Sequence, residues 1–121
     1  MSAASSSLVP LIKAGILSAG MTFSEKVWAL TARIPRGRIT TYAIIARALG
    51  TRAYRAVGMA LKRNPYAPAV PCHRVVGSDG SLTGFARGLA RKKRLLEAEG
   101  VRVTRGRADM RKLFHFPPIC R

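Results

Sequence analysis

The chain has 121 residues, the length of one domain with a single core. Its composition, with 48% apolar and 22% charged residues, excludes a disordered chain, a collagen-like repeat and a membrane-embedded protein. The charge is unusual, because 22 lysines and arginines against 5 acidic residues give a net charge of +17. A polyanion relieves self-repulsion at this charge, so the sequence predicts nucleic acid as the partner.

Metal ligands and targeting signals are scarce in this sequence. The sequence contains two cysteines, Cys72 and Cys120, and two histidines, His73 and His115. These four residues are too few and too widely spaced for a structural zinc site. We therefore expect no metal or cofactor. The apolar stretch Leu8–Leu17 is interrupted by proline, lysine and glycine, so it does not resemble a secretory signal. No run reaches the roughly 20 apolar residues of a membrane span. We expect a protein without a membrane anchor that is cytoplasmic and associated with the nucleoid, or nuclear in a eukaryote.

The first segment, residues 1–21, is rich in serine, alanine and glycine. A flexible leader, a poorly packed remnant of a lost domain and a start-site artefact all remain open as interpretations. Thr22 and Glu25 then form a Thr-x-x-Glu capping box, which predicts a helix over Phe23–Arg33. The following Ile-Pro-Arg-Gly sequence predicts a turn.

Two short helices follow. Thr41 is placed to cap a helix over Tyr42–Leu49, and Thr51 is placed to cap another over Arg52–Arg63. The glycine between them and the basic second helix match the helix-turn-helix pattern. The sequence therefore predicts a mainly α fold, a winged-helix-like helix-turn-helix domain with a small β element.

A stiff loop precedes the predicted β element. Asn64–Pro71 contains three prolines in eight residues, which favours an extended loop. Cys72–Val76 is predicted as a short strand, Gly77–Gly80 as a turn and Thr83–Gly88 as a loop over a site.

The last predicted helix is Leu89–Glu99, with Leu89, Leu95 and Leu96 facing inward and Arg91–Arg94 forming a solvated basic face. Residues 22–101 form the predicted domain, and residues 102–121 form a basic tail. This tail is either a disordered arm or a strand packed on the core.

Cys72 is the strongest candidate for a catalytic nucleophile. It lies between Pro71 and His73, and the neighbouring His73 and Arg74 are expected to favour the thiolate, which is the nucleophilic form. The alternative is an inert, buried structural cysteine. We assign no role to Cys120 or His115.

The sequence around Cys72 resembles the active-site motif of the O6-alkylguanine-DNA alkyltransferases, also called methylated-DNA-protein cysteine methyltransferases. The resemblance covers about Phe23 to Val101, the catalytic and DNA-binding domain of that family. The segments that carry it, in the order of the family, are Gly37-x-Ile39-Thr40-Thr41-Tyr42, Arg55-Ala56-Val57-Gly58, Asn64-Pro65, Pro71-Cys72-His73-Arg74-Val75, and Gly88-Leu89-x-x-Lys92 through Leu95-Leu96-x-x-Glu99-Gly100.

The resemblance implies a one-time transfer of an alkyl group, mainly methyl, from O6-alkylguanine to Cys72, which ends as a thioether. His73, through a water molecule, and Glu99 would remove the thiol proton. Asn64 would tie the stiff loop to the recognition helix, and Tyr42 would donate a proton or a hydrogen bond to the leaving guanine. Without the resemblance, Tyr42 is interpreted as an ordinary half-buried aromatic and Glu99 as a charge partner on a basic helix.

The implied partner is double-stranded DNA containing O6-alkylguanine, bound by a monomer that flips the nucleotide out of the stack. Arg55 would take the place of the extruded nucleotide, although by itself it is interpreted equally well as one more phosphate contact. The small residues of the second helix of the motif would fit the minor groove. The other expected DNA contacts are Thr51, Arg52, Ala53, Ala56 and Arg74. The expected substrate pocket consists of Leu61, Val75, Phe85 and Ala86.

Some features depart from the family. We expect this protein to lack the N-terminal domain that many members carry. Phe85 stands where tyrosine is common, and Arg87 stands where glycine is frequent. A narrower pocket would follow, which favours methyl groups over larger adducts. Two rival functions remain: an alkyltransferase-like lesion sensor, which lacks the acceptor cysteine, and a plain basic winged-helix or RNA-binding module. Neither rival explains a cysteine between proline and histidine.

Overall fold

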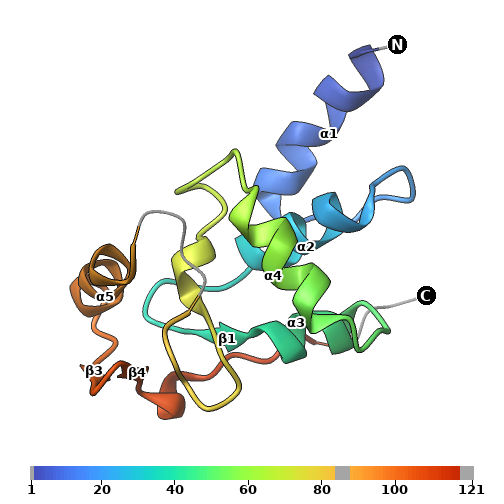
Figure 1. Cartoon of the computed structure of the whole chain (residues 1–121). Coiled ribbons are helices and arrows are strands. Elements are labelled where there is room, and N and C mark those ends of the chain that lie inside the picture. Colours follow the sequence, from blue (N-terminus) through green and yellow to red (C-terminus); the bar gives the residue numbers. More distant parts are fainter. Residues whose placement is uncertain (1, 84–87, 118–121) are drawn as a thin grey trace.

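The computed structural model describes residues 2–83 and 88–117 (Figure 1). Within these ranges the protein is mainly helical with small sheets, which confirms the predicted fold class. The helices are α1 (Ser2–Ala14), α2 (Phe23–Ala32), α3 (Tyr42–Ala48), α4 (Tyr54–Lys62) and α5 (Leu89–Ala98), with 3-10 turns η1 (Cys72–Arg74) and η2 (Met110–Lys112). The strands are β1 (Thr40–Thr41), β2 (Val75–Val76), β3 (Val103–Thr104) and β4 (Arg107–Ala108). None of the described helices is both long and apolar enough to cross a membrane.

Local capping determines where two helices begin. The backbone N–H of Glu25 donates to Oγ1 of Thr22 and the Thr22 N–H donates to Oε1 of Glu25, so the predicted capping box forms at α2. Oγ1 of Thr41 accepts from the Ile44 N–H at the start of α3, as expected. The prediction for Thr51 was wrong. Its hydroxyl accepts from the Ala53 N–H, which closes a turn before α4 begins at Tyr54.

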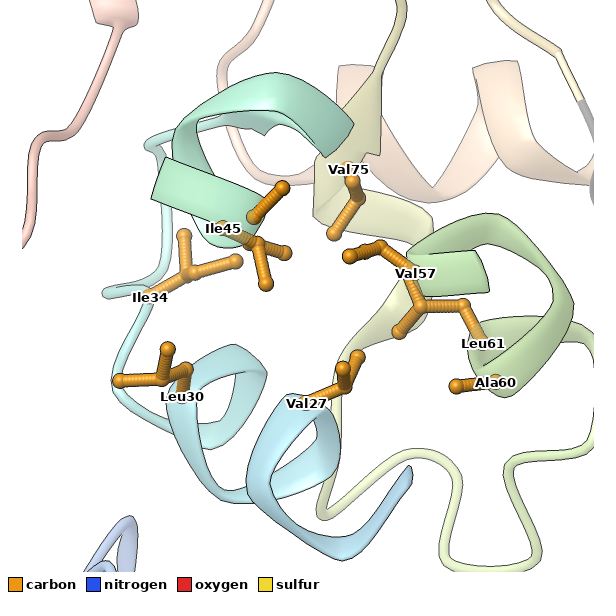
Figure 2. Packing of buried hydrophobic residues seen from close by; sticks show 9 residues of the cluster. Val27, Leu30, Ile34, Ile45, Val57, Ala60, Leu61 and Val75 are labelled. Carbon is orange, nitrogen blue, oxygen red and sulfur yellow. The ribbon is translucent and has the colours of Figure 1, made fainter. Parts of the chain in front are cut away.

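The helix-turn-helix formed by α3 and α4 packs on α2. Figure 2 shows side chains from these three helices meeting in one apolar cluster. The indole N–H of Trp28 on α2 donates to the carbonyl of Ala60 on α4 over 2.8 Å, so a polar contact fixes the two helices as well. The members of the cluster are Val27, Leu30, Ile34, Ile45, Ala46, Val57, Ala60, Leu61 and Val75.

A parallel pairing joins the start of α3 to the segment that contains Cys72. Thr40 pairs with Val75 and Thr41 pairs with Val76. The expectation of a strand over Cys72–Val76 is therefore correct only for its end. The first three residues form a 3-10 turn, in which the Arg74 N–H donates to the Pro71 carbonyl, so the backbone cannot pair with β1 before Val75.

The described part of the leader is helical and packed. Ile12 of α1 is fully buried in a separate apolar cluster with Met21, Ala29 and Val70. Nε of Arg33, the residue after α2, donates to the Gly15 carbonyl over 2.6 Å. The apolar residues Leu8, Leu11 and Ile12 lie three and four positions apart, a helical stripe that Pro10 obscures in the sequence.

The basic tail follows the packed alternative as far as residue 117. After the β3–β4 hairpin, the Ile39 N–H donates to the Lys112 carbonyl and the Phe114 N–H donates to the Ile39 carbonyl. The Thr40 hydroxyl also donates to the Phe114 carbonyl over 3.0 Å. Phe114 packs against the apolar cluster beneath the helix-turn-helix and against Phe116. The tail thus supports β1, which in turn holds the segment around Cys72.

The inward face of α5 differs from the prediction. Leu96 is fully buried with Val101 and Val103, but Leu89 is exposed. Leu89 lies in the first turn of the helix, before the stripe that packs inward, which consists of Lys92 and Leu96.

Because the tail packs on the core, Phe114→Ala should lower the free energy of unfolding by roughly 2 kcal/mol, below the full cost of truncating a completely buried phenylalanine. Urea denaturation followed by circular dichroism measures this loss. The neighbouring variant His115→Ala removes an exposed side chain and should leave the midpoint unchanged. Equal midpoints for both variants would mean that the tail is a detached arm.

Candidate active site

Cys72 lies at the start of η1 as a free, half-buried thiol. Its backbone N–H donates to the Val70 carbonyl over 2.9 Å, and its side chain packs against the cluster that includes Val57 and Leu61 of α4. The thiol is therefore partly accessible to a substrate while its backbone is fixed in a tight turn.

Asn64 fixes the stiff loop that leads to Cys72. It follows α4 directly, its Nδ2 donates to the Val70 carbonyl over 2.8 Å, and its Oδ1 accepts from the Tyr66 N–H over 2.9 Å. Both ends of the loop are thereby tied to one amide side chain. The role expected for Asn64, between the recognition helix and Cys72, stays a prediction.

Two neighbours of Cys72 share one carboxylate on a distant helix end. Nε2 of His73 lies 2.9 Å from Oε2 of Glu99, the residue after α5. Arg74 donates to the same carboxylate from Nε and Nη2, each over 2.8 Å, and its Nη1 donates to the Ile34 carbonyl over 2.6 Å. The Glu99 carboxylate therefore joins η1 to the end of α5. Arg74 also connects η1 to the turn that follows α2, where Ile34 lies.

The surroundings of His73 and Glu99 determine whether each side chain is charged. Burial lowers the pKa of His73 from its ordinary value, against the opposing effect of Glu99, and the nearby Arg74 and Lys92 lower it further. Burial opposes the ionisation of Glu99, but the hydrogen bonds from Arg74 and His73 outweigh it and lower its pKa to about 2. At neutral pH the carboxylate is ionised and the imidazole is uncharged.

Because a carboxylate only accepts hydrogen bonds, Nε2 of His73 carries the proton and Nδ1 is left as an acceptor. A neutral imidazole in this tautomer is able to accept a proton from a thiol, directly or through water.

Arg74 is not placed as the expected DNA contact. All three nitrogens of its guanidinium donate inside the protein, and its side chain is largely buried. The sequence shows a basic residue but not its partner, since Glu99 is 25 positions away. Arg74 positions Glu99 instead.

Lys92 is buried beside the predicted site, so its assignment to a solvated basic face was wrong. The side chain is 1% exposed, and its Nζ donates to the carbonyls of Val75 and Thr83 over 2.6 and 2.9 Å. Burial lowers the pKa of Lys92 to about 8, and Cys72 acts in the opposite direction. The sequence did contain a sign that Lys92 faces inward. Lys92 lies four residues before the apolar Leu96, and this spacing puts both side chains on one face of the helix.

Tyr42 lies against this lysine. Its hydroxyl donates to the Thr83 carbonyl over 2.9 Å, and Nζ of Lys92 lies 5.9 Å from the centroid of its ring. Burial raises the pKa of Tyr42, although the Thr83 hydrogen bond opposes this, and Cys72 raises it further. The phenol is therefore a proton donor rather than a phenolate at neutral pH.

The other predicted residues separate into three groups. Arg52, Ala53, Arg55 and Ala56 are exposed at and before the start of α4, and Thr51 is partly exposed beside them. Leu61 and Val75 are buried in the core under η1, so their side chains are not free pocket walls. Phe85, Ala86 and the neighbouring Arg87 lie outside the described residues. Within the described ranges, no three His, Cys, Asp or Glu side chains gather as metal ligands.

The carboxylate cluster makes a prediction for acid stability. A lowered pKa in the folded state means that ionised Glu99 contributes stability above its ordinary pKa of 4.5, and that this contribution is lost as pH falls toward about 2. Arg74→Gln should cost roughly 2–3 kcal/mol at neutral pH and flatten the profile between these values, because it removes donors from the carboxylate.

Urea unfolding measured at several pH values tests this expectation. Arg111→Gln is the matched control, since Arg111 pairs with Asp109 at the surface. It should leave the stability and its pH profile almost unchanged. If Arg74→Gln behaves like this control, Arg74 is not the residue that holds Glu99 ionised.

Relatives of known sequence match most of the chain. The family model for the DNA-binding domain of 6-O-methylguanine DNA methyltransferase matches residues 22–101. The chain is 53% identical over 81 residues to a methylated-DNA–protein-cysteine methyltransferase of Methanosarcina barkeri, covering 66% of this chain and 51% of the relative. It is 46% identical over 85 residues to that of Mycobacterium tuberculosis, covering 69% and 52%. The chain spans about half the length of these relatives.

Solved structures of proteins related to the same family also match this chain. S. pombe Atl1, in complex with damaged DNA containing O6-carboxymethylguanine, matches with a TM-score of 0.67 and 33% identity over 79% of this chain and 95% of that one. M. tuberculosis OGT, in complex with DNA, matches with a TM-score of 0.63 and 39% identity over 80% and 66%. The arrangement of Cys72, His73 and Glu99 on this fold, together with these matches, shows that the chain belongs to the 6-O-methylguanine DNA methyltransferase family and contains its DNA-binding domain.

Proposed function

We propose that this chain repairs DNA by transferring the alkyl group of O6-alkylguanine, mainly methyl, to its own Cys72. The observation that carries the proposal is the half-buried free thiol in a turn whose next residue, His73, is held neutral and oriented by ionised Glu99. This combination of nucleophile, base and orienting acid has no purpose in a plain DNA-binding module. Each molecule reacts once, because the thioether formed is not a leaving group.

The chemical step follows from the positions of the protons. His73 Nδ1 accepts the Cys72 proton through a water molecule, and Glu99 stabilises the resulting imidazolium. The sulfur attacks the alkyl carbon, so the S–C bond forms as the bond from carbon to O6 breaks. The Tyr42 phenol, which is kept protonated, donates a proton toward the leaving guanine. Lys92 places its positive charge near the thiolate during attack.

Recognition of duplex DNA is proposed for the helix-turn-helix. The exposed start of α4 carries Arg52 and Arg55 with Ala53 and Ala56, so a basic yet narrow helix face is available to a DNA groove. Arg55 replaces the extruded nucleotide in the stack, and the lesion reaches Cys72 behind α4. Such a protein works as a monomer where genomic DNA lies, in the cytoplasm, or in the nucleus of a eukaryote. Arg74 supports the carboxylate rather than the DNA contact.

The second candidate is a non-enzymatic lesion sensor, because Atl1 matches almost along its entire length and binds DNA containing O6-carboxymethylguanine. The presence of Cys72 together with the hydrogen-bonded His73 and Glu99 favours transfer instead. A sensor has no need of a group that removes a thiol proton.

Single-turnover transfer predicts a defined covalent product. After incubation with duplex DNA containing O6-methylguanine, the intact mass should rise by one methyl group, and peptide mapping should locate it on Cys72. Cys72→Ala should still bind the DNA but accept no methyl group. Repeated turnover, or methylation of Cys120 instead, would contradict the assignment, and unaltered mass with tight binding would indicate a sensor.

Nucleotide extrusion is separated from chemistry by comparing duplex substrate with free O6-methylguanine. Arg55→Ala should slow transfer from the duplex by roughly one to two orders of magnitude, since it removes the group that offsets an unstacking cost of a few kcal/mol. The free base needs no extrusion, so its single-turnover rate should barely change.

Two further variants test this interpretation. Arg91→Ala, on the exposed face of α5, should weaken DNA binding modestly and leave the rate with free base unchanged. Tyr42→Phe should react more slowly with both substrates. Equal slowing of both substrates by Arg55→Ala would mean that Arg55 supports the pocket or the fold.

A further inference from the structure

The stiff loop that leads to Cys72 has little backbone hydrogen bonding to hold it in place. Three of the eight residues in Asn64–Pro71 are prolines, which have no N–H to donate. The middle of the loop, residues 67–69, is exposed and adds no buried side chain. Besides the hydrogen bonds described above, the loop is therefore held by the side chains that it buries, among them Tyr66 and Val70.

Val70 joins this loop to α1. Its side chain is fully buried in the apolar cluster that contains Ile12 of α1 (Figure 1). Its carbonyl accepts from Nδ2 of Asn64 over 2.8 Å and from the Cys72 N–H over 2.9 Å. Pro71, with φ −83° and ψ 72°, is the centre of that three-residue turn. The position of Val70 therefore determines the position of the Cys72 backbone.

Tyr66 makes a second connection between the loop and α1. Nζ of Lys13 on α1 lies 5.8 Å from the centroid of the Tyr66 ring, a distance at which a cation–π interaction forms. Trp28 of α2 meets the same ring edge-on, with the ring centroids 5.6 Å apart. The loop is thus packed against the N-terminal helix at Tyr66 as well as at Val70.

We propose that Ile12 is a positioning residue for the alkyl transfer: through the shared cluster it holds Val70, and the Val70 carbonyl holds the Cys72 backbone where the reaction needs it. The sulfur must reach the alkyl carbon while its proton passes toward His73, and a misplacement of about 1 Å costs up to about 100-fold in rate. Ile12 is fully buried, so it acts through Val70 and touches no substrate. This inference rests on the proposed function, since it concerns the same transfer.

A positioning role differs from a purely stabilising one in its effect on the native protein. A residue that only stabilises the fold leaves the rate of the folded molecules unchanged, because each of them keeps the same site. A positioning residue changes that rate. The two roles are separated by measuring rates under conditions in which circular dichroism shows that every variant is folded.

The experiment measures single-turnover methylation by free O6-methylguanine and by duplex DNA that contains it. Ile12→Ala should lower the limiting rate with both substrates by roughly tenfold. Its affinity for the duplex should remain that of the parent protein, since the exposed side of α4 is unchanged. Ile12→Val, which is one carbon shorter than the parent side chain, should recover the rate to within about twofold.

Val103→Ala is the matched control. Val103 of β3 is buried in a different apolar cluster, with Leu82 and Leu96. This variant should lower the stability of the protein but leave the methylation rate of the folded molecules unchanged. Parental rates in folded Ile12→Ala, or equal slowing of Val103→Ala, would overturn the proposal.

Amide hydrogen exchange, followed by NMR, gives a readout that does not depend on methyl transfer. The Cys72 N–H reports opening of its own turn, and the Leu82 N–H reports opening beside the cluster of Val103. Ile12→Ala should accelerate exchange at Cys72 roughly tenfold more than at Leu82, and Val103→Ala should do the reverse. Equal acceleration at both amides in Ile12→Ala would mean that α1 stabilises the fold as a whole, and the proposal would be wrong.

Ile12→Val decides the question if Ile12→Ala does not fold. Its Cys72 N–H should exchange roughly twofold to threefold faster than in the parent protein, with the Leu82 N–H at the parental rate. Unchanged exchange at Cys72 would contradict the inference. If the parent protein itself transfers no methyl group, the proposed function fails, while the exchange rates still decide whether α1 holds the turn at Cys72.

Discussion

The structure depends on one shared acceptor, the Glu99 carboxylate. It accepts hydrogen bonds from His73 and Arg74, while Arg74 also donates to the Ile34 carbonyl. Because η1 is only three residues long, it has little regular backbone hydrogen bonding of its own, so side-chain contacts add to the β1–β2 pairing in fixing its orientation. In a chain with only 5 acidic residues against 22 basic ones, an acid that is nearly buried therefore defines the position of the turn that holds Cys72.

Helix α4, the proposed DNA-binding helix, and the segment around Cys72 pack against the same apolar cluster. The buried side of α4 contributes Val57 and Leu61 to the cluster that includes Val75, and Figure 2 shows these side chains facing one another. The pairing of Thr40 with Val75 adds the start of α3 to the same body. Close-packed side chains transmit displacement rather than absorb it, so this packing holds the backbone of α4 against the segment around Cys72. Under the proposed function, extrusion and attack act on one nucleotide and require the two elements to keep their relative positions.

Features with local causes were predictable from the sequence. The capping box at Thr22 and the cap at Thr41 depend on residues at most three positions apart, and both formed where expected. The resemblance to the family singled out His73, Glu99 and Asn64, and the structure shows the contact between His73 and Glu99 and those of Asn64, while their roles in the reaction stay predictions. Arg74 and Lys92 were misjudged, because a cation on a basic helix or beside a reactive residue looks solvent-facing until its partner is known. Those partners are carboxylate and carbonyl oxygens brought close only by the tertiary fold.

The net charge of +17 favours DNA of any sequence, because phosphates are the same at damaged and undamaged sites. Discrimination under the proposed function must therefore arise after binding, when the nucleotide leaves the stack. A damaged, weakly paired guanine costs less to extrude than an intact one. Only an alkylated guanine then offers Cys72 a carbon to attack. Under the proposed function, Arg55 acts in the first of these steps and the Glu99 cluster in the second, and selectivity then requires no reading of the sequence of bases.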